Sequence, residues 1–153
     1  MDFKEQFSQN VLKYSNSLFF VAKGVLKNDA DAEDAVCNAI MKAYENFGQL
    51  KDIKAFKSWI TRIVINEAYM ICRKNKNTQS IEEILQEPSY IVKYYDDTWE
   101  IVNSLEEEYK TVLILFYYND FSINEIAQTL DIAKGTVKSR LNRGRQKVKE
   151  LIK

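Results

Sequence analysis

Apolar residues recur at steps of three and four along most of the 153-residue chain, which is the periodicity of amphipathic helices. In the N-terminal half this pattern predicts helices over residues 4–26, 31–47 and 56–72. Asn28 and Asp29 mark the first break, and Gly48 is expected to end the second helix as glycine does beyond a helix C-terminus. Three helices of this length can enclose a small core of their own.

The second half of the chain begins after a stretch with no firm periodicity, residues 75–97, which is polar and then acidic and contains the only proline, Pro88. A stretch of this length inside a compact domain would be unusual, so we interpret it as a tether. Beyond it, Ser104 to Glu107 has the pattern of a capping box and predicts a helix through Tyr117. Ser122 is expected to cap a short helix over 123–130, before a basic helix over 134–152.

These elements predict an all-α fold of two small helical domains joined by a flexible linker. The first domain is residues 1–76, the acidic linker is 77–97, and the second domain is 98–153. Only 4 glycines and 1 proline occur in the whole chain, which agrees with helices throughout.

The composition excludes several kinds of chemistry. There is no histidine, so the commonest general base and metal ligand are missing. Cys37 and Cys72 form neither a disulfide framework nor a CxxC metal motif, and are expected to be small buried apolar residues. No glycine-rich phosphate loop occurs. We therefore expect no catalytic site, no metal and no cofactor.

No apolar run reaches the roughly 18 residues that a membrane span requires, and the N-terminus is polar. We accordingly expect a cytoplasmic protein without membrane insertion.

Charge is balanced overall, with 22 basic and 22 acidic residues, but it is segregated along the chain. Residues 51–76 have a net charge of +5, residues 82–108 of −8 and residues 131–153 of +6. Local clusters of lysine and arginine bind phosphates whatever the net charge of the protein. The basic runs could be only solvent-exposed helix faces. Because both lie on helices with a defined apolar face, binding to nucleic acid is the favoured interpretation.

The segment from Ser122 to Arg145 has the spacing of a helix-turn-helix. Val137, Leu141, Val148 and Leu151 define the inner face of its second helix when each residue is advanced by about 100°. Hydrogen-bonding side chains occupy the middle of the outer face and cations flank them, as a recognition helix in a major groove needs. The predicted DNA-binding residues are Lys134, Thr136, Lys138, Ser139, Arg140, Arg143 and Lys147.

Two alternatives stay open at this point. A helix-turn-helix alone would also suit a regulator that binds DNA without RNA polymerase. The acidic helix over 31–45 would suit a phosphate-handling or metal enzyme, although the missing histidines and nucleotide loop argue against one.

The two halves together resemble the extracytoplasmic-function (ECF) sigma factors of the sigma-70 family. Residues 31–74 are similar to region 2 and residues 105–149 to region 4, with region 3 lacking between them. The resemblance implies a protein that directs core RNA polymerase to promoters by reading −35 and −10 elements. It implies no enzyme activity of the chain's own.

The resemblance also assigns surfaces in the first domain. The helix from Asp31 is expected to dock on the clamp helices of the largest polymerase subunit through Asp34, Asn38, Met41, Lys42 and Glu45. The family usually has Gln-Glu where this chain has Cys37-Asn38, so one carboxylate of that interface is lost. The −10 element is expected to contact a base-capturing loop and the helix that follows it, through Leu50, Lys51, Lys54, Arg62, Asn66, Arg73 and Lys74. The second domain is expected to meet the polymerase flap region, and an anti-sigma factor is an expected partner.

Overall fold

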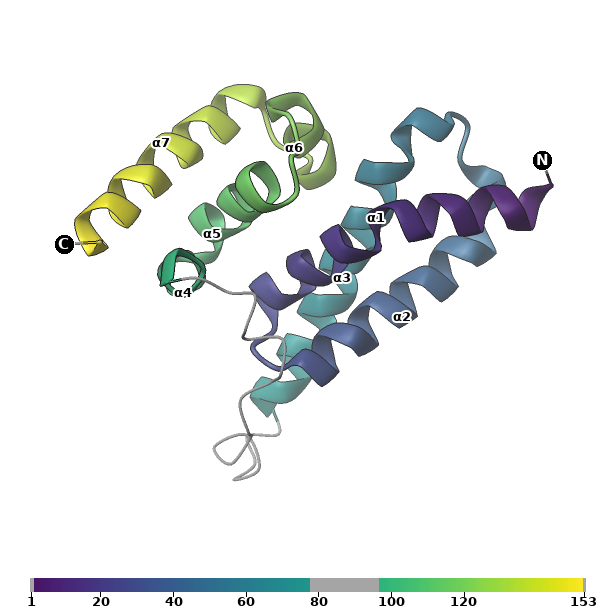
Figure 1. The fold of residues 1–153 in the computed structure, drawn as a ribbon, viewed down its shortest axis with the longest axis horizontal. Coiled ribbons are helices and arrows are strands. Elements are labelled where there is room, and N and C mark those ends of the chain that lie inside the picture. Colours follow the sequence, from purple (N-terminus) through teal and green to yellow (C-terminus); the bar gives the residue numbers. More distant parts are fainter. Residues whose placement is uncertain (1, 78–96, 153) are drawn as a thin grey trace. The chain divides into compact units, whose positions relative to one another are not determined.

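The computed structural model describes residues 2–77 and 97–152, and the chain divides into two compact units between Lys74 and Asn75. Every regular element in these ranges is helical (Figure 1), which confirms the predicted all-α class. The first unit is built by α1 (Phe3–Val25), α2 (Asp29–Asn46) and α3 (Phe56–Asn77). The second contains α4 (Asp97–Asn103), α5 (Glu107–Leu113), α6 (Ile123–Leu130) and α7 (Lys134–Leu151). Most of the predicted tether falls on residues 78–96, which lie outside the described residues.

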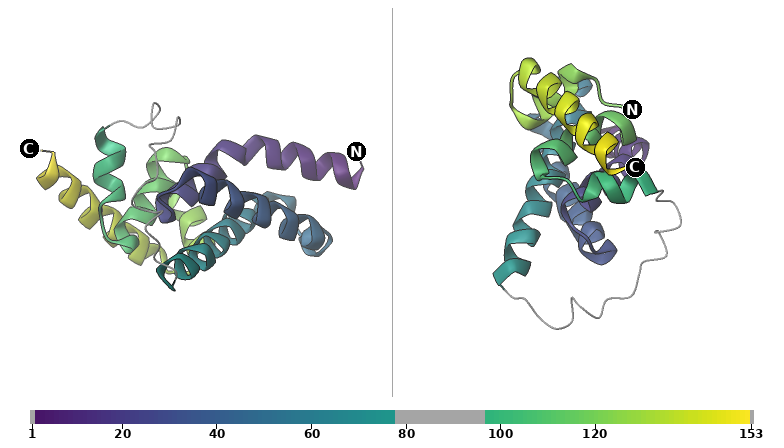
Figure 2. Two further views of the ribbon diagram at one scale, coloured as in Figure 1. Left: turned by 90° about the horizontal axis from the view of Figure 1, so that it is seen from below. Right: turned by 90° about the vertical axis from the view of Figure 1, so that its left-hand side faces the viewer.

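Helices α1 and α2 form an antiparallel pair that lies side by side in each view (Figure 2). The reversal is capped by Asn28, whose side chain accepts hydrogen bonds from the backbone amides of Ala30 and Asp31 at 2.7 and 3.3 Å. Four fully buried alanines of α2 allow a close approach of the two helices: Ala32, Ala35, Ala39 and Ala43.

A buried ion pair closes the same corner. Lys23 Nζ lies 2.5 Å from Asp29 Oδ1, and it also donates a hydrogen bond to the carbonyl of Lys27 at 3.1 Å. Both side chains are almost removed from solvent, with 7% and 12% of their surfaces exposed. The pair therefore ties the end of α1 to the first residue of α2 and fixes the direction in which α2 leaves the corner.

The other end of this unit is closed by aromatic rings. Phe47 sits in a 3₁₀ turn, η1 (Phe47–Gln49), and its ring centre lies 5.2 Å from that of Phe7 and 5.8 Å from that of Phe56. These edge-to-face contacts bury Phe56 completely, and Trp59 packs 5.8 Å from it. Phe56 is thus a core residue of the first unit.

The second unit shows the predicted helix-turn-helix. Ser122 caps α6, as predicted, by accepting from the amide of Glu125, and the carboxylate of Glu125 accepts in return from the amide of Ser122 to complete a capping box. Asp131 ends α6 with φ of 57°, a left-handed conformation that aspartate tolerates better than bulkier residues do. The amide of Ile132 then donates to the carbonyl of Ala127, and α7 begins at Lys134.

The capping box predicted at Ser104 is wrong. Ser104 instead donates its hydroxyl to the carbonyl of Ile101 at 2.6 Å and closes the end of α4. Helix α5 begins later, at Glu107, with Glu106 as an N-cap whose side chain makes no capping bond. It also ends earlier than predicted and continues as a π-helical turn, η5 (Ile114–Tyr118).

Three other expectations about single residues were wrong. Gly48 lies within η1 without a positive φ, so it does not end α2 as a left-handed cap. Leu151 was expected on the inner face of its helix but is 55% exposed, because it is the last residue of α7. Cys37 is exposed on α2, whereas Cys72 is half-buried.

Candidate nucleic-acid interface

Helix α7 carries all seven residues predicted to bind DNA in the second unit. Lys134, Lys138, Ser139 and Arg143 are exposed, whereas Thr136, Arg140 and Lys147 are half-buried. The inner face of α7 is set by Val137 and Leu141, which are fully buried, and by Gly144. A Cβ atom at Gly144 would lie 2.9 Å from Leu113 Cδ1, so glycine permits α7 to approach α5 this closely.

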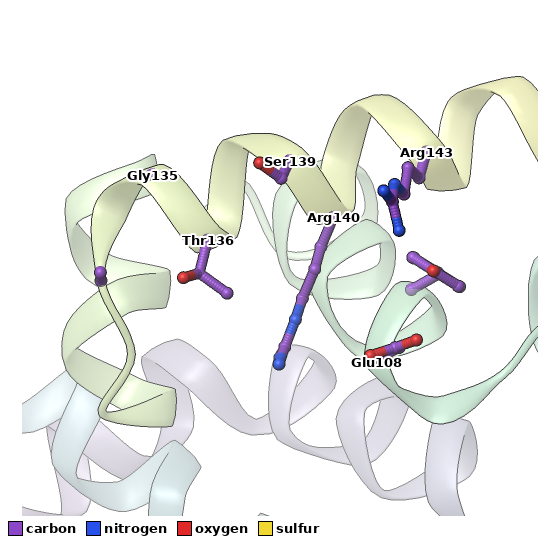
Figure 3. A pocket seen from close by; sticks show the side chains of 8 residues that line it. Glu108, Gly135, Thr136, Ser139, Arg140 and Arg143 are labelled. Atoms are coloured by element: carbon purple, nitrogen blue, oxygen red, sulfur yellow. The ribbon is translucent and has the colours of Figure 1, made fainter.

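The N-terminal half of α7 and the start of α5 enclose a hollow (Figure 3). Arg140 and Arg143 reach over it from α7, while Glu108 faces it from α5. The hollow therefore combines two guanidinium groups with a carboxylate, and hydroxyl groups lie beside them. Its lining is Glu108, Tyr109, Ala133, Gly135, Thr136, Ser139, Arg140 and Arg143.

Sequence reasoning missed the partners that α5 gives to Lys147. Its ammonium group lies 3.5 Å from Glu106 Oε1 and 5.3 Å from the centre of the Tyr109 ring. A hydrogen bond with its own backbone, and then the charge of Lys147, lower the pKa of Glu106, which stays ionised at neutral pH. An exposed ion pair of this kind contributes little to stability. It therefore orients Lys147 without preventing a contact with phosphate.

The residues predicted for the second DNA surface come from two elements of the first unit. Arg62, Asn66 and Arg73 are exposed and, at steps of four and seven, share one face of α3. Leu50, Lys51 and Lys54 belong to the connection between α2 and α3, where Leu50 is half-buried and both lysines are exposed. This connection contains the turn η2 (Ile53–Ala55), capped by Asp52, whose carboxylate accepts from the amide of Lys54 at 3.0 Å. Lys74 is exposed next to Arg73.

Known families match both units. The sequence pattern of "Sigma-70 region 2" matches residues 11–78, and that of "Sigma-70, region 4" matches residues 95–148. The chain belongs to the sigma-70 family of sigma factors. It is an RNA polymerase sigma factor of the ECF type that directs transcription initiation, and it is not an enzyme.

Relatives of this sigma factor match over nearly its whole length. It is 25% identical to the "ECF RNA polymerase sigma factor SigW" of Bacillus subtilis, with 98% of this chain and 90% of the relative covered. It is 29% identical to "RNA polymerase sigma factor SigV" of the same organism, with 87% and 82% covered. Among solved structures, the sigma factor RpoE of Bartonella quintana, in complex with the anti-sigma factor NepR, gives a TM-score of 0.79 at 27% identity, with 95% and 96% covered.

The match of region 2 together with region 4 separates a sigma factor from a stand-alone helix-turn-helix regulator, which the second unit alone could not do. It also removes the enzyme alternative for the acidic helix. Among the described residues, no group of three or more histidine, cysteine, aspartate or glutamate side chains is placed to hold a metal ion. No described helix combines the length and apolar character that a membrane span needs.

The sigma factor presents one exposed face on α2. Asp34, Asn38, Met41 and Glu45 follow each other at steps of four, three and four and are all exposed, Met41 to 64%. Lys42 is exposed as well, but it forms an ion pair with Glu67 of α3, which is buried. Sequence reasoning did not anticipate this pair, because the carboxylate comes from another helix and its spacing carries no signal.

Proposed function

We propose that this sigma factor reads a −35 promoter element with α7 and a −10 element with α3 and the connection before it. The −35 assignment is supported by the arrangement of side chains on α7. Polar side chains line the hollow beside the helix N-terminus while cations flank it, which suits insertion into a major groove. The residues assigned to this contact are Lys134, Thr136, Lys138, Ser139, Arg140, Arg143 and Lys147.

The −10 contact is assigned to the exposed face of α3 and to the lysines before it. A flipped base needs a hydrogen-bonding and apolar pocket, and the single strand beside it needs cations. Asn66 offers an exposed amide between Arg62 and Arg73, and Leu50 offers a half-buried apolar side chain.

Replacing Asn66 by alanine is expected to slow open-complex formation roughly fivefold, which corresponds to the loss of one hydrogen bond. Stopped-flow fluorescence of a promoter labelled in the −10 element would measure this rate with the reconstituted holoenzyme. Affinity for a duplex that contains only the −35 element should not change. If melting is as fast as in the wild type, Asn66 does not belong to the pocket.

The exposed face of α2 is proposed to dock on the clamp helices of the largest polymerase subunit, with Asp34, Asn38, Met41, Lys42 and Glu45 as contacts. An exposed methionine among charged residues is typical of an interface, because its apolar side chain is otherwise left in water. Within this set, Lys42 also forms an ion pair with Glu67 of α3.

Changing Asp34 to arginine is expected to weaken association with core polymerase at least roughly fivefold, because the substitution reverses a charge at the proposed interface. Titration of core enzyme with labelled sigma factor would measure the dissociation constant. Glu5→Arg, an equal charge reversal at an exposed position of α1, is the matched control. Equal affinities for the wild type and Asp34→Arg would contradict the docking assignment.

The second unit is proposed to contact the flap region of the polymerase through an apolar hollow at the C-terminal half of α7. Its lining is largely apolar and also includes Arg145 and Lys149; the other lining residues are Thr98, Val102, Leu113, Tyr117, Tyr118, Val148 and Ile152. An anti-sigma factor is proposed as a further partner, supported by the similarity to RpoE, whose structure contains one. Because core polymerase is its proposed partner, we also propose that the protein acts in the cytoplasm.

Transcription in vitro from a pool of random promoters tests the proposed function as a whole. Core polymerase with this sigma factor should enrich promoters that share two short elements at a fixed spacing. Core polymerase alone should enrich none. If the sigma factor binds duplex DNA selectively by itself but adds no promoter-dependent transcription, the proposal fails.

A further inference from the structure

The structure of the second unit points to a specificity determinant on α7 outside the residues assigned above to DNA. We propose that Asn142 reads one base pair of the −35 element as a hydrogen-bond donor only, and that Arg145 is the positioning residue that imposes this orientation. The inference rests on the proposed contact between α7 and the major groove.

Arg145 is anchored on the π-helical turn. Its Nε donates to the Tyr117 hydroxyl at 2.5 Å, and its guanidinium carbon lies 5.6 Å from the ring centres of both Phe116 and Tyr117. The two rings meet edge to face, with centres 4.9 Å apart. A planar guanidinium held by two rings and a hydroxyl has a fixed direction, which a flexible ammonium group would lack.

The fixed guanidinium in turn fixes Asn142. Nη1 of Arg145 donates to Asn142 Oδ1 at 3.1 Å. Arginine has only donors, so the atom of the amide that faces it must be the oxygen. The NH₂ group of Asn142 is therefore directed away from Arg145, and it presents two donors from an exposed side chain.

Asn142 lies where a base reader should lie. It stands between Ser139 and Arg143 in sequence, and on the helical wheel it falls near Gly135 and Ser139 on the face opposite the buried Val137. Ser139 and Arg143 both line the hollow of Figure 3.

The orientation predicts which bases Asn142 accepts. A free asparagine pairs with adenine in two bonds, donating to N7 and accepting from the N6 amino group. With Oδ1 turned toward Arg145, the accepting half of that pair is lost. The two donors instead suit guanine, which offers acceptors at N7 and O6, or the O4 acceptor of thymine. Arg145 thus converts an adenine-reading side chain into one that prefers bases with acceptors alone.

Promoter selection with the reconstituted holoenzyme tests this inference. A pool randomised over the −35 element would be transcribed with the wild type, Asn142→Ala, Arg145→Lys and Tyr117→Phe. Arg145→Lys keeps the positive charge but loses the planar contact with both rings, and Tyr117→Phe removes only the hydroxyl that accepts from Nε. Gln146→Ala removes another exposed amide from α7 and is the matched control. Thermal unfolding would confirm that each variant is folded.

The wild type is expected to prefer guanine or thymine over adenine at one base pair by roughly fivefold or more. Asn142→Ala should abolish the preference at that base pair alone. Arg145→Lys and, more weakly, Tyr117→Phe should allow adenine at the same base pair. Because Arg145 and Tyr117 also line the hollow proposed for the flap, the readout is the base preference among promoters within each variant, not total output.

Three results would overturn the inference while leaving the proposed function of α7 in place. An unchanged preference in Asn142→Ala removes Asn142 as a reader. A loss that is equal for all promoters in Arg145→Lys makes Arg145 a phosphate contact or a structural residue. If the base preference changes in Asn142→Ala but not in Arg145→Lys, Arg145 does not position Asn142. If the wild-type holoenzyme selects no −35 sequence at all, the proposed function of α7 fails first, and the inference fails with it.

Discussion

Replacing Lys23 by methionine is expected to lower the free energy of unfolding of the first unit by about 3 kcal/mol. Methionine fills much of the same volume, so packing is largely kept. The carboxylate of Asp29 would however lose its partner while both of its oxygens stay shielded from water. An unpaired buried charge is costly, and the position of Asp29 at the N-terminus of α2 offsets only part of the cost.

Urea unfolding of the full chain, followed by circular dichroism, would measure the effect of Lys23→Met. Hydrogen exchange of the α1 and α2 amides would assign the change to the first unit. Lys27→Met is the control, because Lys27 is exposed in the same corner and its loss should change stability by less than about 0.5 kcal/mol. Equal stability of the two variants would show that the ion pair does not hold the corner.

The corner matters for function because α2 carries the proposed polymerase-binding face. A loosened corner would let α2 change its direction relative to α1. We therefore expect Lys23→Met to weaken core binding at temperatures where the first unit begins to open, although Lys23 is buried on α1 and does not belong to the proposed polymerase-binding face.

Two serines show how far the sequence predicts this fold. Ser122 and Ser104 are each followed by a glutamate three residues later, but only Ser122 makes the capping box. The hydroxyl of Ser104 instead bonds to the carbonyl of Ile101 at the C-terminus of α4, and α5 starts beyond the serine. The local pattern predicted a helix after each serine, but it did not show that Ser104 closes a preceding helix, α4.

The candidate site was also only partly predictable from the sequence. Periodicity located α7 and its outer face correctly, because the buried residues Val137 and Leu141 recur at helical steps. It could not find Glu108 in the hollow, the Lys42–Glu67 pair or the contacts of Arg145 with the π-helical turn. Each of these joins residues from two helices, and such contacts depend on tertiary packing that no spacing within one helix encodes.

Replacing Arg143 by alanine is expected to cost about 2 kcal/mol of promoter affinity and to relax base choice at one position of the −35 element. Arg143 is exposed beside the hollow, where its guanidinium can donate two parallel hydrogen bonds to a guanine edge. Glu108 on the facing wall makes the hollow less attractive to a phosphate than two arginines alone would be, which favours a base over the backbone as the contact.

Fluorescence anisotropy of the holoenzyme on labelled promoter fragments would measure the loss in Arg143→Ala. Lys138→Ala is the matched control, since Lys138 is an exposed cation of the same helix on a flank of the outer face. The control should weaken all sequences alike and reduce the dependence of affinity on salt, as a lost phosphate contact does. Arg143→Ala should instead lower affinity for the best promoter most and leave the salt dependence nearly unchanged. An equal loss on every promoter, with a reduced salt dependence, would place Arg143 on the phosphate backbone.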